Sequence, residues 1–387
     1  MIVRCKRCVA TNSRPEQVLD KNGICNACHS FEKKKLINWE ERKKQFKKEI
    51  EEAKKNKIKD NWDCIIPSSG GKDSTAQAFI AKEYGLNPLI VTATTCDLSD
   101  IGKKNIENLK KNFDTIEISP QKKIRSRLNK ISLETLGDIS WPEHVAIFTQ
   151  PIQIASKFDI KLILYGEQPQ FEYGGPIRSN SNVMNRDWME EFGGFLGFRV
   201  SDLINHYDFK REDLLPYIFP DENLISNKKI KAIFMGYYID WNNEKNFSLS
   251  KSKGFEPFKS SIEGGNVSYE KIDNYQHGIH DYFKYLKYGF SRSTDQASWM
   301  IRQNIISRDE GVRLVKDNDG KYPSSYLGKK LFEILKEIDV TIEEFNDICD
   351  KFTNKEIFKC NQAGELIKDE EGKLTLIDDG FNESSNH

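Results

Sequence analysis

Short apolar runs alternate with longer stretches of helical periodicity through the middle of the chain. The apolar runs predict strands at residues 64–67, 89–94, 115–118, 161–165 and 232–237. The stretches between them predict helices near residues 75–84, 101–112 and 143–158. Because alternating strands and helices form β-α-β units, the pattern predicts an α/β fold on a parallel sheet.

The segments that flank this region follow helical patterns. In the lysine-rich stretch 33–59, Trp39, Phe46, Ile50 and Ala53 share one helical face, which predicts a helix docked along one stripe. Contact with RNA is the alternative explanation for its excess of basic residues. Beyond about residue 250 the chain is predicted to be mostly helical, at 281–288, 294–304, 308–315, 325–338 and 341–352. The acidic stretch from Glu365 predicts a frayed end.

Composition and charge are those of a globular protein. The 59 Lys and Arg residues balance 59 Asp and Glu residues, which excludes a polycation or polyanion and indicates no class of partner. No apolar run approaches the ~20 residues that cross a bilayer, and the first residues lack an apolar signal sequence. We therefore expect a cytoplasmic protein with no membrane partner.

Two Cys-x-x-Cys pairs stand near the N-terminus, separated by sixteen residues. This spacing is typical of a four-thiolate zinc ribbon, and a reducing compartment favours metal over disulfides. Such a site is structural, because four thiolates leave no position for a catalytic water. The predicted zinc ligands are Cys5, Cys8, Cys25 and Cys28. An iron–sulfur cluster is an alternative, while unliganded thiols are disfavoured because this segment has few apolar residues to hold itself together.

The strand at 64–67 runs into a glycine turn and then a helix. Gly70 and Gly71 let successive N–H groups converge on an anion, and the helix adds its positive end. Ser69, Lys72 and Ser74 add side-chain donors, which together predict a polyphosphate site. Asp73 suits a Mg²⁺ ion or a helix cap. The alternative is an ordinary capped turn, and the spacing excludes a Walker loop.

This turn resembles the Ser-Gly-Gly-x-Asp-Ser signature of the PP-loop ATP pyrophosphatases. The resemblance implies a sheet of the adenine nucleotide alpha hydrolase type, cleavage of ATP between its α- and β-phosphates, and transfer of AMP to a substrate oxygen. It implies Lys72 and Asp73 as catalytic candidates. The implied ATP-binding residues are Ser68, Ser69, Gly70, Gly71, Lys72, Asp73, Ser74 and Thr92, the last on the strand that would line the adenine side.

Four segments together look like the N-acetyl sugar amidotransferases of bacterial surface-glycan synthesis. They are the two cysteine pairs, Trp141-Pro-Glu-His144, residues 165–175, and residues 290–298 with 301–308. Ser291 and Asn304 depart from the family, in which we associate both positions with glycine. Asn tolerates left-handed backbone angles better than most residues, so Ser291 is the larger departure.

The reaction that this resemblance implies replaces the oxygen of an acetamido group with nitrogen. ATP would adenylate the carbonyl of a nucleotide-linked N-acetyl sugar, and ammonia would then give an acetamidino sugar, AMP and pyrophosphate for lipopolysaccharide O-antigen or another surface glycan. Residue 2 is Ile and no Gly-x-Cys-x-Gly elbow is present, so ammonia must come from another chain. The resemblance implies a glutaminase of the histidine-biosynthesis type and a cyclase-like barrel subunit.

Further site residues follow from their positions. Glu167 lies just past a strand, where ligands collect in open α/β sheets, and Glu172 lies in the loop beyond it. Either one binds Mg²⁺, sugar hydroxyls or ammonium, or is a solvated loop carboxylate. His144 is a catalytic candidate or a structural histidine. A set comprising Arg292, Asp295, Arg302 and Arg308 predicts a clamp on substrate phosphates, with surface ion pairing as the alternative.

Two other functions remain open on the sequence. A tRNA-thiolating PP-loop enzyme would use Cys96 as its reactive thiol and the 33–59 helix as its RNA contact. A zinc-ribbon adaptor with a degenerate ATP fold would only bind partners. The predicted division of the chain is a zinc ribbon at 1–30, a basic helical connector at 31–60, a PP-loop ATP-binding α/β region at 61–250, and a helical region at 251–387.

Overall fold

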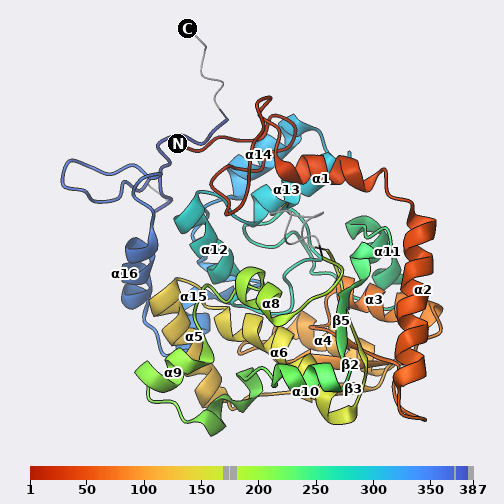
Figure 1. The fold of residues 1–387 in the computed structure, drawn as a ribbon. Helices are drawn as coiled ribbons and strands as arrows, with labels where there is room; N and C mark the ends of the chain where they lie inside the picture. Colours follow the sequence, from red (N-terminus) through yellow and green to blue (C-terminus); the bar gives the residue numbers. More distant parts are fainter. Residues whose placement is uncertain (169–173, 175–180, 370–371, 382–387) are drawn as a thin grey trace.

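The computed structural model describes residues 1–168, 174, 181–369 and 372–381, and it contains a five-stranded parallel sheet with helices beside it (Figure 1). The sheet order is β3-β2-β1-β4-β5, and every neighbouring pair is parallel. This confirms the predicted α/β fold. The strands are β1 Cys64–Pro67, β2 Pro88–Ala93, β3 Thr115–Ile118, β4 Leu162–Tyr165 and β5 Lys231–Phe234.

The strand order reverses between β1 and β4. The chain moves outward from β1 to β3 and then returns to place β4 on the other side of β1, where Ile65 pairs with Ile163. Connections that leave β1 and β4 therefore depart in opposite directions and open a crevice at the carboxyl ends of these strands. Ligands of open α/β sheets bind at such a switch point.

Helices cover both faces of the sheet, so its strands are apolar on both sides. Ile66 and Ile90 pack towards α3 (Lys72–Glu83), while Ile65 and Val91 pack towards α6 (Trp141–Phe158). These two helices and α4 (Asp100–Lys110) lie where helices are predicted. The fourth helix of this region, α5 (Lys122–Leu136), is absent from the sequence-based prediction.

Two helices precede the sheet, α1 (Asn26–Lys34) and α2 (Trp39–Asn56). Phe46, Ile50 and Ala53 of α2 are buried, and most of the lysines around them are exposed. The predicted single apolar stripe is therefore confirmed. In Figure 1, α1 lies beside α13 (Arg292–Arg302) and α14 (Arg308–Asn318), away from the sheet.

Beyond about residue 250 the main regular elements are helices, as predicted, but the described residues of 253–276 and 353–381 form no helix, and the region encloses an apolar core. The helix predicted at 325–338 is wrong in its first half. Leu327 and Gly328 have positive φ angles of 50° and 85°, which turn the chain into a two-stranded hairpin of β6 (Ser325–Tyr326) and β7 (Lys329–Lys330). The remaining helices are α11 (Asn243–Ser252), α12 (His277–Tyr288), α15 (Leu331–Lys336) and α16 (Ile342–Phe352).

Two further predictions are corrected by local structure. The strand predicted at 232–237 ends at Phe234, because residues Met235–Tyr237 form a 3₁₀ turn, η3. The stretch from Glu365 is predicted to fray, yet its described residues form bridges and bury Leu374 against the helical core, while residues 370–371 and 382–387 lie outside the described part of the chain. Among the described residues, no helix combines the length and apolar character needed to cross a membrane.

The segment between β4 and β5 carries short helices. They are α8 (Arg186–Phe192), α9 (Val200–His206), η2 (Arg211–Tyr217) and α10 (Glu222–Asn227). Tyr217 and Leu203 pack with Trp141 and Val145 of α6, so this segment covers the outer side of that helix. Its placement fixes the N-terminal turn of α6 against the sheet.

Candidate functional site

A cavity of about 410 Å³ opens at the switch point of the sheet. Its floor comes from the carboxyl ends of β1, β2 and β4, where Ser68, Ala93 and Gly166 line it. One wall is the N-terminal part of α6, and another is the segment Tyr269–His277 that precedes and begins α12. Residues from distant parts of the sequence therefore face one space.

The glycine turn forms the part of the cavity at the start of α3. Ser68 Oγ donates to Ser74 Oγ at 2.8 Å and accepts from the Gly70 N–H at 3.0 Å, which ties the two ends of the turn together. Gly71 is the N-cap of α3, and Ser69, Gly71 and Ser74 all line the cavity. The turn presents its donors and the positive end of α3 to the cavity, an arrangement that suits an anion.

Lys72 and Asp73 lie together at this end of the cavity. The Lys72 ammonium is buried and contacts Asp73 Oδ2 at 2.5 Å, Glu270 Oε1 at 3.4 Å and Asn243 Oδ1 at 3.4 Å. Burial by itself lowers the pKa of Lys72, but Asp73 and Glu270 outweigh it and leave the pKa above its usual range. The lysine is therefore a fixed cation.

Asp73 is the more accessible member of this pair. Its Oδ1 accepts from Asn246 Nδ2 of α11 at 2.9 Å, and its side chain is 32% exposed. A carboxylate that is oriented from two sides and open to the cavity can hold a Mg²⁺ ion with nucleotide phosphates. The alternative of a simple helix cap has no support here, because α3 has no side-chain cap hydrogen bond.

The first turn of α6 brings Glu143 and His144 to the cavity. Glu143 accepts hydrogen bonds from the Cys96 N–H and from Asn129, and its burial raises its pKa to about 7. Burial lowers the pKa of His144 to about 4, so its ring is neutral at pH 7. The His144 ring packs edge-on against His280, with 5.3 Å between the ring centres.

The segment Tyr269–His277 carries charged side chains that no sequence motif predicts. Asp273 pairs with His277 at 3.2 Å. Burial alone would raise the pKa of Asp273, but its interactions with His277 and Lys271 outweigh burial and lower the pKa to about 2. Lys271 lines the cavity, and burial lowers its pKa. Arg292 also lines the cavity, with its guanidinium held by both oxygens of Asp281 at 3.0 and 3.1 Å. No local motif marks residues 269–277.

The predicted Arg and Asp clamp is divided by the structure. Arg292 is the member that reaches the cavity. Asp295 is buried and contacts Arg14 at 2.6 Å and Lys284 at 2.5 Å, so it is a structural centre of charge pairing. Arg302 and Arg308 approach the N-terminal cysteines instead, and neither is among the described residues that line the cavity. Helical spacing put these residues near one another but could not decide which space each one faces.

Three other predicted site residues lie in different positions relative to the cavity. Glu167 follows β4 and lines the cavity, as expected from its position. Thr92 is buried on the face of β2 opposite to Val91 and Ala93, and only these two neighbours line the cavity, because strand side chains alternate. The prediction for the Thr92 side chain therefore has no support. Glu172 lies outside the described residues.

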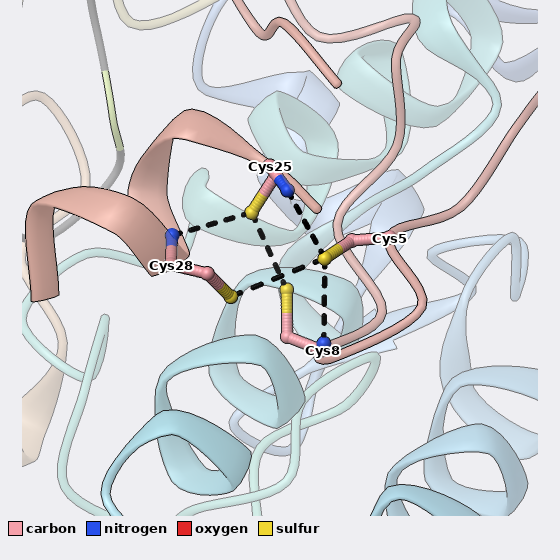
Figure 2. A group of neighbouring side chains, drawn as sticks. All are labelled: Cys5, Cys8, Cys25 and Cys28. Atoms are coloured by element: carbon pink, nitrogen blue, oxygen red, sulfur yellow. Dashed lines mark hydrogen bonds between the residues drawn. The ribbon is translucent and has the colours of Figure 1, made fainter. Parts of the chain in front are cut away.

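The four N-terminal cysteines form a second site, and Figure 2 shows their sulfur atoms pointing towards one another. Their ligand atoms all lie within 4.8 Å of one another, with Cys5 and Cys28 at 3.9 Å and Cys8 and Cys25 at 3.7 Å. Four sulfurs at ~2.3 Å from a zinc ion would be about 3.8 Å apart. The buried quartet could therefore bind a structural metal such as zinc.

Backbone donors surround this quartet. The N–H groups of Arg7, Cys8 and Cys25 point at Cys5 Sγ at 3.3–3.5 Å, and the Cys28 N–H points at Cys25 Sγ at 3.4 Å. The Arg302 guanidinium lies 3.9 Å from Cys8 Sγ. Such donors stabilise thiolates, the form of cysteine that binds metals. The donor set therefore fits a metal carrying four negative ligands.

One comparison with known proteins gives a match. Residues 266–370 match the family described as LPS biosynthesis protein WbpG-like, C-terminal domain. No curated protein matches the chain. The matched region includes Lys271, Asp273, His277 and Arg292, and so it supplies the whole of the cavity wall formed by Tyr269–His277. The match supports a role for this chain in surface polysaccharide synthesis.

Proposed function

We propose that the chain is an ATP-dependent amidotransferase that converts the acetamido group of a nucleotide-linked N-acetyl sugar into an acetamidino group. One observation carries the proposal. The glycine turn at 69–74 and the wall matched to a lipopolysaccharide biosynthesis family line a single cavity, where Lys72 of the turn lies 3.4 Å from Glu270 of the matched region. A nucleotide held by the turn would thus have its phosphates directed towards a sugar substrate.

Activation of the acetamido oxygen is the first step of this reaction. The turn and Lys72 would hold the ATP phosphates while the carbonyl oxygen attacks the α-phosphorus. A P–O bond forms to the carbonyl oxygen, and the bond to pyrophosphate breaks. Asp73 and Glu167 would bind Mg²⁺, which neutralises phosphate charge. The resulting O-adenylyl imidate has AMP as a good leaving group, which an unactivated amide lacks.

Ammonia then replaces the activated oxygen. It forms a bond to the imidate carbon, and AMP departs with the electron pair of the broken C–O bond. The sequence has no glutaminase signature, so we propose that a separate glutaminase and a cyclase-like barrel subunit deliver ammonia to the cavity. Zinc in the cysteine quartet would be structural, with no part in these steps.

The thiolation alternative lacks a suitable thiol. Cys96 is 8% exposed, burial raises its pKa, and its sulfur contacts Ser126 Oγ at 3.6 Å. It is also not among the described residues that line the cavity. A reactive cysteine is accessible and has a lowered pKa, so these properties favour a buried structural group.

The reaction can be tested with purified protein, Mg-ATP, ammonium chloride and a panel of nucleoside diphosphate-linked N-acetylhexosamines. Mass spectrometry should find a product one mass unit lighter than its substrate, because NH replaces O, together with one AMP per product. AMP formation only in the presence of bulk tRNA would instead support thiolation. If no mixture yields AMP or the lighter sugar product, the proposal is contradicted.

The Asp73→Ala variant tests the role of the turn. We expect it to fold normally and to lose at least 10²-fold in AMP formation, because the phosphates lose their metal-binding carboxylate. Glu83→Gln is the matched control, since Glu83 is an exposed residue at the far end of the same helix. Full activity in Asp73→Ala would exclude the turn as the nucleotide site.

A further inference from the structure

The carboxylate of Glu143 is held rigidly at the cavity wall. The Cys96 N–H donates to its Oε1 at 3.3 Å, and Asn129 Nδ2 of α5 donates to its Oε2 at 2.9 Å. Asn129 is itself fixed by a hydrogen bond to the Ile139 carbonyl at 2.6 Å. A carboxylate has about four acceptor positions, so each oxygen keeps a lone pair for a further partner.

Three other carboxylates that line the cavity have lysine or histidine partners. Asp73 and Glu270 contact Lys72, and Asp273 pairs with His277. The two donors of Glu143 are neutral groups, and the charge of Arg125 on α5 influences it less than burial does. Glu143 is therefore the better placed of these four to take up a proton.

Unpartnered polar atoms accompany Glu143 in the cavity wall. Thr95 Oγ1, Ser140 Oγ and Asn274 Nδ2 are buried, and none has a hydrogen-bond partner among the described residues. Their residues line the same cavity as Glu143 and come from three separate segments. Buried polar groups are almost always paired in a folded protein. These enclosed groups make the wall around Glu143 polar, whereas Glu143 itself lines the open cavity.

Protonation of Glu143 lies near balance at neutral pH, because burial raises its pKa to about 7. The titratable and charged groups that face it are Arg125 on α5, Cys96 after β2 and Tyr217 on η2, with His144 beside it on α6. Lys271 and His277, from the segment Tyr269–His277, act on His144 and lower its pKa further. An acid–base group works best when its pKa is close to the operating pH.

We propose that Glu143 is the base of the ammonia step, accepting a proton from the nitrogen that adds to the adenylated carbon. This inference rests on the proposed amidotransferase function. Ammonia forms the C–N bond, and one N–H proton passes to the Glu143 carboxylate. The C–O bond to AMP breaks and AMP leaves with its electron pair. Glu143 returns the proton to solvent before the next turnover.

The Glu143→Gln variant separates this step from adenylation. Exchange of pyrophosphate into ATP, measured with acceptor sugar and without ammonia, should stay within threefold of wild type. Amidine formation should fall about 10²- to 10⁴-fold, the usual contribution of a positioned base. With rates expressed per concentration of free NH₃, the wild type should show an inflection near pH 7 that the variant lacks.

Two further variants keep the inference falsifiable. Glu143→Asp retains a carboxylate and should keep a pH inflection at reduced rate, while Glu83→Gln should match wild type in every assay. The inference is overturned if Glu143→Gln makes amidine at more than a third of the wild-type rate, or loses both half-reactions equally. A wild type that forms neither AMP nor amidine would instead contradict the proposed function itself.

The pH dependence of stability supplies a readout that needs no substrate. The pKa of Glu143 rises from 4.5 to about 7 on folding, so the folded state binds the extra proton between these values. This group therefore lowers the free energy of unfolding as pH rises through that window. The free energy of unfolding of Glu143→Gln should therefore increase relative to that of wild type between pH 5 and pH 8. If the difference between the two proteins stays constant over this range, Glu143 is not a buried carboxylate with a raised pKa.

Discussion

Adjacent glycines in the turn at 69–74 serve different purposes. Gly70 has a φ of +80°, and a Cβ added there would lie 2.9 Å from the Ile106 nitrogen. Gly71 has a φ of −69°, and its added Cβ would lie 3.6 Å from Ser69 Oγ, which is ordinary contact. The first glycine is required by the fold, whereas the space beside the second faces the cavity.

A pair of alanine substitutions tests this distinction. Gly70→Ala should lower the free energy of unfolding by about 1–3 kcal/mol, because a side chain is forced into a left-handed and crowded position. Gly71→Ala should change it by less than about 0.5 kcal/mol and weaken Mg-ATP binding, because its methyl group enters the phosphate space. Urea unfolding and calorimetry measure the two effects. Equal losses of stability would contradict the assignment.

Residues that depart from the amidotransferase pattern are accommodated in the C-terminal region. Asn304 has a φ of +57°, the left-handed conformation expected at a position suited to glycine. Ser291 has a φ of −135°, and its N–H and hydroxyl both donate to Asp319 at 3.0 and 2.7 Å. Neither departure disturbs α13, whose first residue is the cavity-lining Arg292.

At the scale of elements, the N-terminal segment has little apolar core of its own, although Val9 packs against Ala297 and Val315. The apolar cluster there consists of the four cysteines with Ala10 and Ala27, and the larger side chains around it are only partly buried. Such a core removes too little apolar surface from water to stabilise thirty residues. A metal bound to the quartet would supply the missing free energy.

Metal removal should therefore unfold this segment before the sheet. We expect one zinc ion per chain by metal analysis, and chelation should expose residues 1–30 to proteolysis while Mg-ATP binding persists. A Cys8→Ser variant should show the same pattern without chelator. Strong absorption near 400 nm would indicate an iron–sulfur cluster, and resistance of residues 1–30 to proteolysis without metal would contradict a metal-dependent core.

Across the whole molecule, a chain of ion pairs connects the cysteine segment with the cavity. Arg14 contacts Asp295 at 2.6 Å, and Arg292 lies 3.8 Å from the same carboxylate while holding Asp281 at 3.0 Å. Nearby cations outweigh burial and hold the pKa values of Asp281 and Asp295 well below their usual range. Arg292 is thus positioned partly by a residue of the N-terminal segment.

Removal of the Arg14 side chain should weaken binding of the acceptor sugar. Arg14→Ala leaves Asp295 with two cations, so we expect a loss of about 1–2 kcal/mol in stability, less than for a fully buried pair. Arg292 should then shift towards Asp295, raising KM for the acceptor sugar severalfold with KM for ATP within twofold. Arg7→Ala is the control, because Arg7 pairs with Glu32 on the exposed side of the same segment. Equal changes in both KM values would exclude this coupling.

The sequence alone determined the parallel sheet, the glycine turn and the cysteine quartet. Each of these depends on neighbouring residues: apolar runs that suit strands, glycines that suit a left-handed turn, and cysteine pairs at ligand spacing. The sheet is confirmed, the quartet could bind zinc as predicted, and the four-part division of the chain stays a prediction. The reversed strand order and the missed helix α5 depend on packing that periodicity does not specify.

Only the tertiary structure decided which side chains share the cavity. Lys271, Asp273 and His277 stand more than a hundred residues from Glu143, and no local pattern distinguishes them from surface charges. Conversely, Arg302 and Arg308 have the right composition for a phosphate clamp but face the cysteines. Local patterns report the conformation of a segment, whereas the pKa of Glu143 and the partners of Arg292 depend on burial and on charges that folding brings from elsewhere.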